Sequence, residues 1–127
     1  GSDLAFIEQV MYRTSITDFV SIADHGDPWF DWTTDWGSAP IVGSTGRTFD
    51  FRQPCRRHDF GYRNLQRMEH RYGTGATYWK AANRARVDRQ LYTDMNAHCR
   101  ARRWHDQPSC FAWATTFYAA VRVAGGP

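Results

Sequence analysis

The sequence predicts an all-α fold, a small helical domain that also contains one long loop. Hydrophobic residues recur at helical spacings of three and four over most of the chain, whereas residues 24–52 follow no period and are rich in Pro and Gly. Hydrophobic residues make up 42% of the 127 residues, which excludes a disordered chain. No apolar run reaches the roughly 20 residues that a membrane span needs. We expect residues 1–127 to form one domain, with Gly1-Ser2 a cloning remnant.

The first 23 residues predict one or two amphipathic helices. Two apolar stripes lie here: Leu4, Ile7, Val10 and Met11, then Phe19, Val20 and Ala23. Thr14 or Ser15 is the expected cap of a second helix, because hydroxyl side chains accept hydrogen bonds from helix N-terminal amides. The long loop of residues 24–52 follows, and long loops in small domains are usually functional.

Three longer helices are predicted after this loop. The first begins near Gln53-Pro54, because Pro suits the first position of a helix, and the second spans residues 80–99. The third begins near Pro108. Their inward stripes are Cys55, His58, Tyr62, Leu65 and Met68; then Val87 or Asp88, Leu91, Tyr92, Met95 and Cys99; then Cys110, Trp113, Ala114, Phe117 and Val121.

Charge is distributed unevenly along the chain. Residues 1–51 hold eight acidic and two basic residues, whereas residues 52–127 hold fourteen basic and five acidic ones. Fifteen of the sixteen basic residues are Arg, which favours contact with the phosphates of a nucleic acid or of lipid head groups. A GC-rich genome that encodes Arg in place of Lys explains the same composition.

Three cysteines, an odd number, predict one disulfide pair and one unpaired residue. Cys99 and Cys110 flank the polar segment 100–109, so a disulfide between them would close a loop between two helices. No CxxC motif is present and no His lies at zinc-finger spacing from a Cys pair, which argues against a structural zinc site.

Two polar residues, His58 and Asp88, stand on the inward stripes of their helices. A buried carboxylate needs a partner because an unpaired buried charge costs several kcal/mol, and a buried imidazole is a natural one. If the two helices are antiparallel neighbours, Asp88 can hold one ring nitrogen of His58 and leave the other as a general base. A pair that only ties two helices together also fits this spacing.

Asp59 follows His58 directly and therefore points about 100 degrees away around the helix. There it can meet the long loop, whose Asp27, Asp31 and Asp35 are oxygen ligands suited to Ca²⁺. The spacing is not that of an EF-hand, so solvated loop acids without a metal are the alternative.

No side-chain nucleophile stands out. Residues 43–46 (GSTG) are not a G-x-S-x-G elbow, and no P-loop, dinucleotide fingerprint or HExxH motif is present. Cys55 lies one turn before His58 and leaves a Cys-His dyad open, because a helix N-terminus and Arg56-Arg57 would favour a thiolate.

These residues carry a resemblance to a known family. Residues 55–64 (CRRHDFGYRN) resemble the active-site helix of the prokaryotic and fungal secreted phospholipase A2 family. Residues 30–35 (FDWTTD) resemble its calcium loop, residues 86–95 (RVDRQLYTDM) resemble its second catalytic helix, and the pair Cys99 and Cys110 matches its C-terminal disulfide.

The resemblance implies an all-α fold with two antiparallel catalytic helices and a long calcium-binding loop. It implies that His58 is the general base that removes a proton from water and that Asp88 orients its imidazole. It implies Ca²⁺ bound by Asp35, Asp59 and the backbone carbonyl of Trp36. The reaction would be hydrolysis of the sn-2 ester of a glycerophospholipid to a fatty acid and a lysophospholipid.

The sequence departs from the family in the calcium loop. Family members usually join this loop by a second disulfide to the Cys before the active-site His, but Trp36-Gly37-Ser38 offers no Cys here. We therefore expect Cys55 to be a free, buried thiol and the loop, rebuilt at residues 43–47, to be more mobile. The resemblance also implies that the backbone N–H of Gly37 helps the Ca²⁺ to stabilise the oxyanion.

The resemblance also implies a secreted enzyme that acts on phospholipid membrane surfaces or micelles. We expect a monomer that binds no nucleic acid. Aromatic candidates for contact with lipid, at least half of which core packing would explain, are Phe6, Phe19, Trp29, Trp32 and Trp36. A non-catalytic membrane-binding or toxin-like module on the same scaffold is the alternative, and a basic nucleic-acid-binding or nuclease domain is a third hypothesis.

Overall fold

The computed structural model describes residues 2–36, 41–44, 47–75 and 77–124, and within them it contains five helices and one two-stranded sheet. The elements are α1 (Ser2–Tyr12), α2 (Ile16–His25), β1 (Ile41–Ser44), β2 (Arg47–Asp50), α3 (Arg52–Tyr72), α4 (Ala81–Arg100) and α5 (Gln107–Ala124). The predicted helical fold is confirmed, and the N-terminal segment forms two helices.

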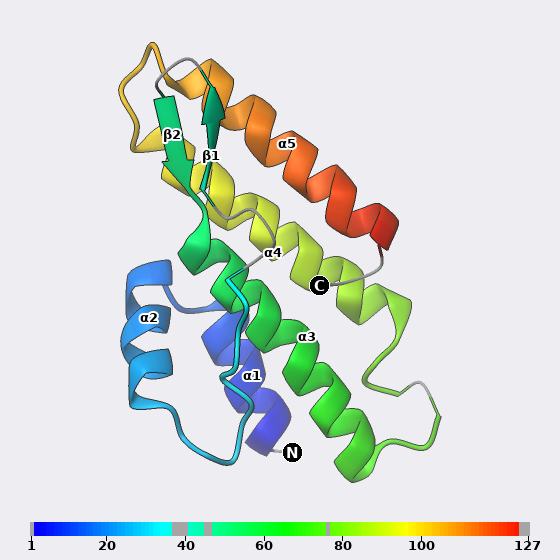
Figure 1. Ribbon diagram of the computed structural model, residues 1–127. Coiled ribbons are helices and arrows are strands. Elements are labelled where there is room, and N and C mark those ends of the chain that lie inside the picture. Colours follow the sequence, from blue (N-terminus) through cyan, green and yellow to red (C-terminus); the bar gives the residue numbers. More distant parts are fainter. Residues whose placement is uncertain (1, 37–40, 45–46, 76, 125–127) are drawn as a thin grey trace.

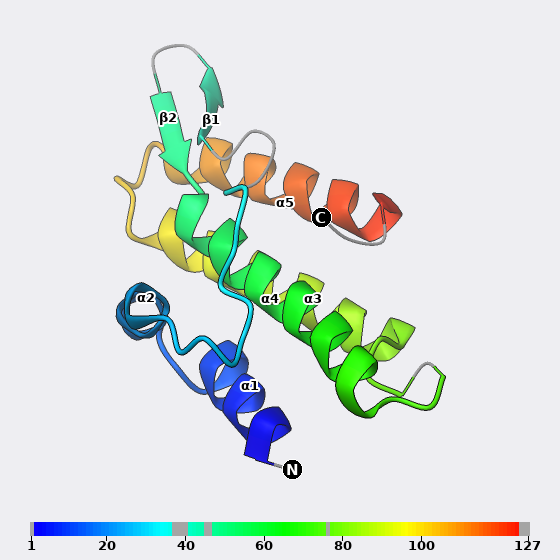
Figure 2. The same cartoon turned by 60° about the horizontal axis from the view of Figure 1, so that its bottom comes forward.

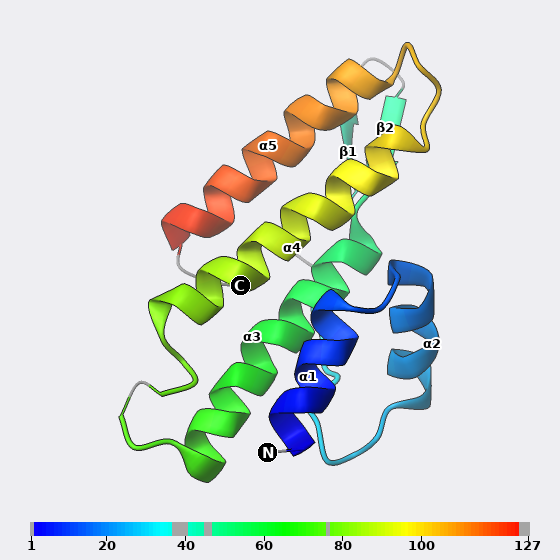
Figure 3. The same cartoon turned by 180° about the vertical axis from the view of Figure 1, so that it is seen from behind.

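The helix α3 lies in the middle of the molecule. It packs between α4 on one side and the pair α1 and α2 on the other (Figures 1 and 2). The helices α3 and α4 run antiparallel, as do α4 and α5, and α5 lies on the far side of α4 from α3 (Figure 3). None of the described helices is long and apolar enough to cross a membrane. The segment CRRHDFGYRN therefore occupies the most central helix.

The turn between α1 and α2 is defined by a side-chain cap. Ser15 is the N-cap of α2, and its Oγ accepts a hydrogen bond from the Asp18 amide at 3.1 Å. Of the two predicted caps, Ser15 is therefore the correct one, whereas the Thr14 hydroxyl donates to the Gln9 carbonyl at 2.7 Å. At its other end α2 stops at Gly26, whose φ of 65° is left-handed and favours glycine.

Residues 41–50 contain a β-hairpin, where the sequence predicted an irregular loop. Ile41 pairs with Asp50 and Val42 pairs with Phe49 in antiparallel register. Val42 and Phe49 are buried in a cluster with side chains of α4 and α5, whereas Ile41 is exposed. Strands of four residues contain too few alternations to reveal a period, so this pairing is not legible in the sequence.

Close packing of α3 against its neighbours requires a glycine in mid-helix. A Cβ on Gly61 would lie 2.8 Å from Cγ1 of Val87 on α4 and 2.9 Å from Cε of Met11 on α1. Because Gly costs helix stability of up to about 1 kcal/mol relative to Ala, its place here reflects this close approach. The close approach brings the inward faces of α3 and α4 into direct contact.

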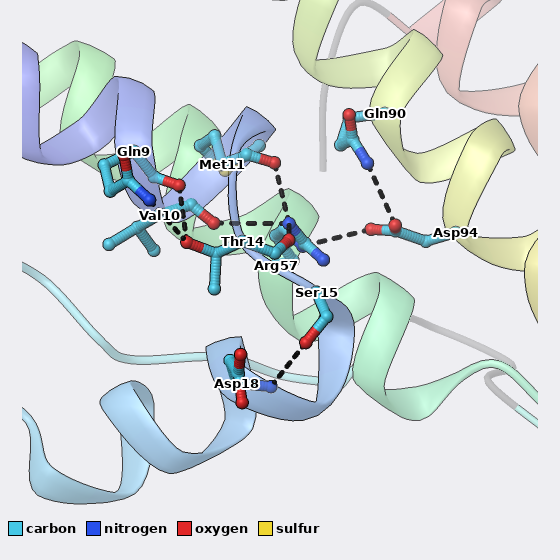
Figure 4. A network of polar contacts seen from close by, with 9 residues as sticks. All are labelled: Gln9, Val10, Met11, Thr14, Ser15, Asp18, Arg57, Gln90 and Asp94. Carbon is cyan, nitrogen blue, oxygen red and sulfur yellow. Dashed lines mark hydrogen bonds and ion pairs between the residues drawn. The ribbon is translucent and has the colours of Figure 1, made fainter.

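Arg57 is buried at the meeting point of α1, α3 and α4 (Figure 4). Its Nη1 donates to three backbone carbonyls of the segment that ends α1, those of Val10, Met11 and Thr14, at 3.2, 2.8 and 2.8 Å. Its Nε lies 3.1 Å from Oδ2 of Asp94 on α4, an ion pair without the alignment of a hydrogen bond. The guanidinium thus satisfies carbonyls that a helix end leaves unpaired, and it joins three helices next to His58.

Ion pairs join the acidic and basic halves of the chain. Arg86 on α4 donates twice to Glu8 on α1, at 2.8 and 2.7 Å, and Arg56 on α3 donates to Asp24 on α2 at 2.9 Å. Part of the charge asymmetry therefore serves contacts within the fold. A disulfide joins Cys99 to Cys110, as predicted, and covalently closes the connection between α4 and α5. For a loop of this length the stabilisation is about 3 kcal/mol.

Candidate active site

A histidine-aspartate pair bridges α3 and α4. His58 Nε2 lies 2.7 Å from Oδ1 of Asp88, and both side chains are buried. The structure thus brings together the two polar residues that the helical stripes placed on facing surfaces. Thirty positions separate them in the chain, so the contact depends on the antiparallel packing of the two helices.

The hydrogen bond to Asp88 determines which ring nitrogen of His58 carries the hydrogen. An ionised carboxylate can only accept hydrogen bonds, so the His58 hydrogen lies on Nε2 and Nδ1 keeps its lone pair. Nδ1 has no hydrogen-bond partner among the described residues. A neutral imidazole held in this way can accept a proton at Nδ1, which is the requirement for a general base.

Asp88 is held by two further donors that the sequence did not reveal. The Tyr62 hydroxyl donates to its Oδ1 at 2.7 Å, and Nη1 of Arg122, in the last turn of α5, donates to its Oδ2 at 2.8 Å. Burial raises the pKa of Asp88, but the hydrogen bonds from His58, Tyr62 and Arg122 outweigh it and the net pKa lies below the ordinary value. Asp88 is therefore ionised at neutral pH.

The signals for these two donors were present but ambiguous. Tyr62 stands on the inward stripe of α3, where its ring fits an apolar position and its hydroxyl gives no separate signal. Its pKa is raised, chiefly by burial and by the hydrogen bond to Asp88, so its hydroxyl stays protonated and donates. Arg122 is the one charged residue of α5, and a single cation in a mostly apolar helix is a signal that could have pointed to a buried acid opposite it.

Asp59 faces the loop that precedes β1. Its Oδ2 accepts hydrogen bonds from the Thr34 hydroxyl at 2.5 Å and from the Asp35 amide at 3.2 Å. Burial raises the pKa of Asp59, and the neighbouring charge of Asp35 raises it further. Two carboxylates that repel each other in this way form a site that a cation would stabilise.

Asn64 attaches the same loop to α3. Its side-chain oxygen accepts from the Asp31 amide at 2.9 Å, and its side-chain nitrogen donates to the Asp31 carbonyl at 2.7 Å. The same nitrogen also donates to the carbonyl of Phe60, one turn earlier on α3. Arg63 adds a hydrogen bond to the Thr33 hydroxyl at 2.8 Å. The motif CRRHDFGYRN therefore positions the loop as well as the imidazole, and this role of Asn64 is not predicted by the sequence pattern.

The remaining loop residues divide into local turns and the candidate ligands. Asp27 and Asp31 accept hydrogen bonds within their own turns, from the Trp29 amide and the Thr33 amide, both at 2.9 Å. Trp36 has a φ of 63°, a left-handed conformation that is costly for a residue with a side chain. Gly37, the expected oxyanion donor, lies outside the described residues.

The oxygen donors of the predicted metal site suit a hard cation, although they include few carboxylates. No group of three or more His, Cys, Asp or Glu side chains that could hold a metal occurs in the described part of the chain. The predicted site contains two carboxylates, Asp35 and Asp59, and takes the Trp36 backbone carbonyl as its third ligand. Such oxygen donors suit Ca²⁺, which readily accepts carbonyls and water.

Cys55 is a free, buried thiol, as expected from the missing loop cysteine. Burial raises its pKa to about 12, and the charges of Asp59, Asp35 and Asp50 add to the effect. The thiolate is therefore strongly disfavoured, which removes the Cys-His dyad from consideration.

The aromatic candidates fall into two groups. Phe6, Phe19 and Trp32 pack in the core, where the Trp32 ring stacks on Phe60 with centroids 4.5 Å apart. Trp29 and Trp36 are partly exposed, and arginine side chains lie over both rings. Core packing therefore explains three of the five, and contacts within the fold engage the other two, Trp29 and Trp36.

The fold and this site identify the family. A model of the prokaryotic phospholipase A2 family matches residues 7–125, and the chain belongs to that family. It is 32% identical over 123 residues to a secretory phospholipase A2 of Beauveria bassiana (strain ARSEF 2860), across 94% of this chain and 57% of that protein. It is 27% identical over 127 residues to a secretory phospholipase A2 of Arthroderma benhamiae (strain ATCC MYA-4681 / CBS 112371), across 95% of this chain and 78% of that protein. The chain thus spans little more than half the length of the Beauveria relative.

Proposed function

We propose that this protein is a calcium-dependent phospholipase A2 that hydrolyses the sn-2 ester of glycerophospholipids. The observation that carries the proposal is the buried His58-Asp88 pair. Nδ1 of His58 has no partner among the described residues, and His58 lies on the same helix as Asp59. Membership of the phospholipase A2 family supports the same reaction class.

Water is the nucleophile in this proposal. His58 Nδ1 takes one proton from water while the oxygen bonds to the ester carbonyl carbon, and the carbonyl electron pair moves onto its oxygen. The resulting imidazolium is stabilised by the ionised Asp88. The carbon-oxygen bond to the glycerol then breaks, and the same imidazolium returns its proton to the departing alkoxide, which yields a fatty acid and a lysophospholipid.

Asp35, Asp59 and the Trp36 carbonyl are the proposed ligands of Ca²⁺. When bound there, the cation would supply Lewis-acid stabilisation of the negative charge on the ester oxygen. Burial, and to a smaller extent the charge of Asp35, raises the pKa of Asp59, and a cation at this place would relieve both effects. Asn64 and Thr34 hold the loop in position for it.

Tyr62 and Arg122 are proposed as positioning residues. Because they occupy both oxygens of Asp88 together with His58, they leave the carboxylate little freedom to rotate. The imidazole ring is thereby held in one orientation. We further propose that the protein acts, as a secreted monomer, on phospholipid membrane surfaces or micelles, in keeping with relatives that are named secretory.

Fatty-acid release from phospholipid vesicles tests the proposal directly. Wild-type protein should release the sn-2 acyl chain of a lipid with two different chains, and a calcium chelator should stop the release. His58→Ala should lower turnover by at least about a hundredfold, the low end for a general base. Near-wild-type turnover by this variant would refute the assignment, and vesicle binding without any fatty-acid release would favour the non-catalytic alternative.

A further inference from the structure

The connection between α4 and α5 presents a cluster of cations around one tryptophan. Arg100, Arg102, Arg103, Trp104 and His105 are all exposed. The Trp104 side chain is 82% exposed, more than any other of the six tryptophans. Figures 1 and 3 show this connection at one end of the molecule, the end at which the β-hairpin also lies.

A disulfide and several hydrogen bonds fix the backbone of this connection. The Cys99–Cys110 disulfide closes it, and the Gln107 side chain donates to the carbonyls of Arg100 and Arg102 at 3.3 and 3.0 Å. The Arg102 amide also donates to the Cys99 carbonyl at 3.0 Å. Trp104 is therefore held out from the surface by a tied loop, and its exposure does not arise from a frayed end.

Trp104 lacks the contacts that engage the other exposed tryptophans. The Trp29 indole donates to Asp3 at 2.9 Å, and the guanidinium of Arg71 lies 3.7 Å from the centroid of its ring. Trp104 has one ring contact, edge-on with His105 at 5.5 Å, and its indole N–H has no partner among the described residues. An indole of this kind suits a place that is apolar on one side and wet on the other.

Two guanidinium groups near Trp104 in the sequence also lack partners within the described fold. The guanidinium groups of Arg100 and Arg103 have no hydrogen-bond or ion-pair partner in the described part of the chain. The acid in this connection, Asp106, lies 3.9 Å from His105. Arginine binds phosphate oxygens bidentately, and tryptophan favours the interface between lipid and water.

We propose that this loop, with Trp104 flanked by Arg100 and Arg103, docks the protein on anionic phospholipid surfaces. The proposal deepens the proposed function and rests on it, because it assigns the contact with the lipid surface on which hydrolysis occurs. Asp88 precedes Arg100 by twelve positions on α4, or about 18 Å along a helix. The docking loop therefore lies apart from the reacting groups.

Binding to vesicles that cannot be hydrolysed separates docking from catalysis. Ether-linked phosphatidylglycerol and phosphatidylcholine vesicles carry no acyl ester, and a chelator removes any calcium. Sedimentation should show that wild-type protein prefers phosphatidylglycerol. Trp104→Ala and the double variant Arg100→Gln/Arg103→Gln should each weaken that binding by about tenfold or more. For the double variant this follows because each cation near an anionic surface contributes about fivefold. For Trp104 it follows because tryptophan favours the interface between lipid and water. Both variants should hydrolyse dispersed short-chain phospholipid as the wild type does.

Matched controls remove an exposed tryptophan or two positive charges elsewhere. Trp29→Ala and the double variant Arg13→Gln/Lys80→Gln should bind phosphatidylglycerol within about twofold of wild type. The proposal fails if wild type does not bind these vesicles, if the loop variants bind as wild type does, or if the controls weaken binding as much. Loss of hydrolysis in all assays with intact vesicle binding would instead refute the proposed function and leave docking in place.

Discussion

Arg122 and Asp88 form an ion pair across the packing of α5 on α4, with Nη1 of the arginine 2.8 Å from Oδ2 of the buried carboxylate. The other oxygen, Oδ1, accepts from His58 and Tyr62 at 2.7 Å each. Three elements of the fold thus converge on one carboxylate. The C-terminal helix contributes directly to the geometry of a pair that lies on α3 and α4.

Replacement of Arg122 tests this positioning role. Arg122→Gln should lower kcat by about tenfold with little change in KM, because Asp88 loses its constraint on Oδ2 while the substrate contacts persist. Arg122→Lys, which keeps a cationic donor, should restore most of kcat. Steady-state kinetics on dispersed substrate measure both. An unchanged kcat in Arg122→Gln, or a change confined to KM, would contradict the role.

Calcium titration separates the two carboxylates of the proposed metal site. Asp35→Asn should raise the calcium requirement more than it changes activity at saturating metal. Asp59→Asn should damage both, because Asp59 also accepts the hydrogen bonds that order Thr34 and Asp35. Vesicle hydrolysis at increasing calcium measures the two effects.

The wild-type affinity for calcium should be weak. Each loop residue that must be fixed costs about 1–2 kcal/mol, and no disulfide anchors this loop, so a Kd of about 10⁻⁴ to 10⁻³ M is expected. Activity that is indifferent to a chelator would refute the metal site. Sub-micromolar binding would refute the argument from loop entropy.

Cys55 should be dispensable for catalysis. Its thiol is buried, and burial raises its pKa to about 12, so it cannot act as a nucleophile at neutral pH. Cys55→Ala should keep activity within a few-fold of wild type, with only a small loss of stability from lost packing. A larger loss of activity in a variant with unchanged thermal unfolding would reopen the dyad hypothesis.

Asp94 should make the stability of the protein depend on pH in an unusual direction. Burial raises its pKa to about 6, and Arg57 and Gln90 offset only part of that effect. Between about pH 6 and pH 4 the folded protein therefore binds a proton that the unfolded chain, with a pKa near 3.9, does not. Acidification over this window should raise the contribution of Asp94 to the free energy of unfolding.

The Asp94→Asn variant isolates that contribution, because it shares every other titration with the wild type. The unfolding free energy of wild type minus that of the variant should rise by up to about 3 kcal/mol between pH 7 and pH 4. Urea unfolding at several pH values measures this difference. A difference that is constant, or that falls on acidification, would show that Asp94 is ionised in the fold throughout.

The sequence alone determined the helices, their inward faces and the residues with chemistry on those faces. Hydrophobic periodicity reports which side of a helix faces inward, so His58 and Asp88 were visible as polar residues on apolar stripes. A cap at Thr14 or Ser15 and the Cys99–Cys110 disulfide were also predictable, because both depend on residues close together in the chain; the structure selects Ser15 as the cap.

Which residues meet across elements depends on tertiary packing and could not be predicted from local patterns. The hairpin of residues 41–50, the ion pair of Arg122 with Asp88, and the burial of Arg57 against Asp94 all depend on packing between elements. From the local sequence pattern a charged residue is predicted to lie on the surface, because the partners of its charge lie tens of residues away in the chain. The energy that keeps such a group buried comes from carbonyls and carboxylates that are brought to it only by the fold.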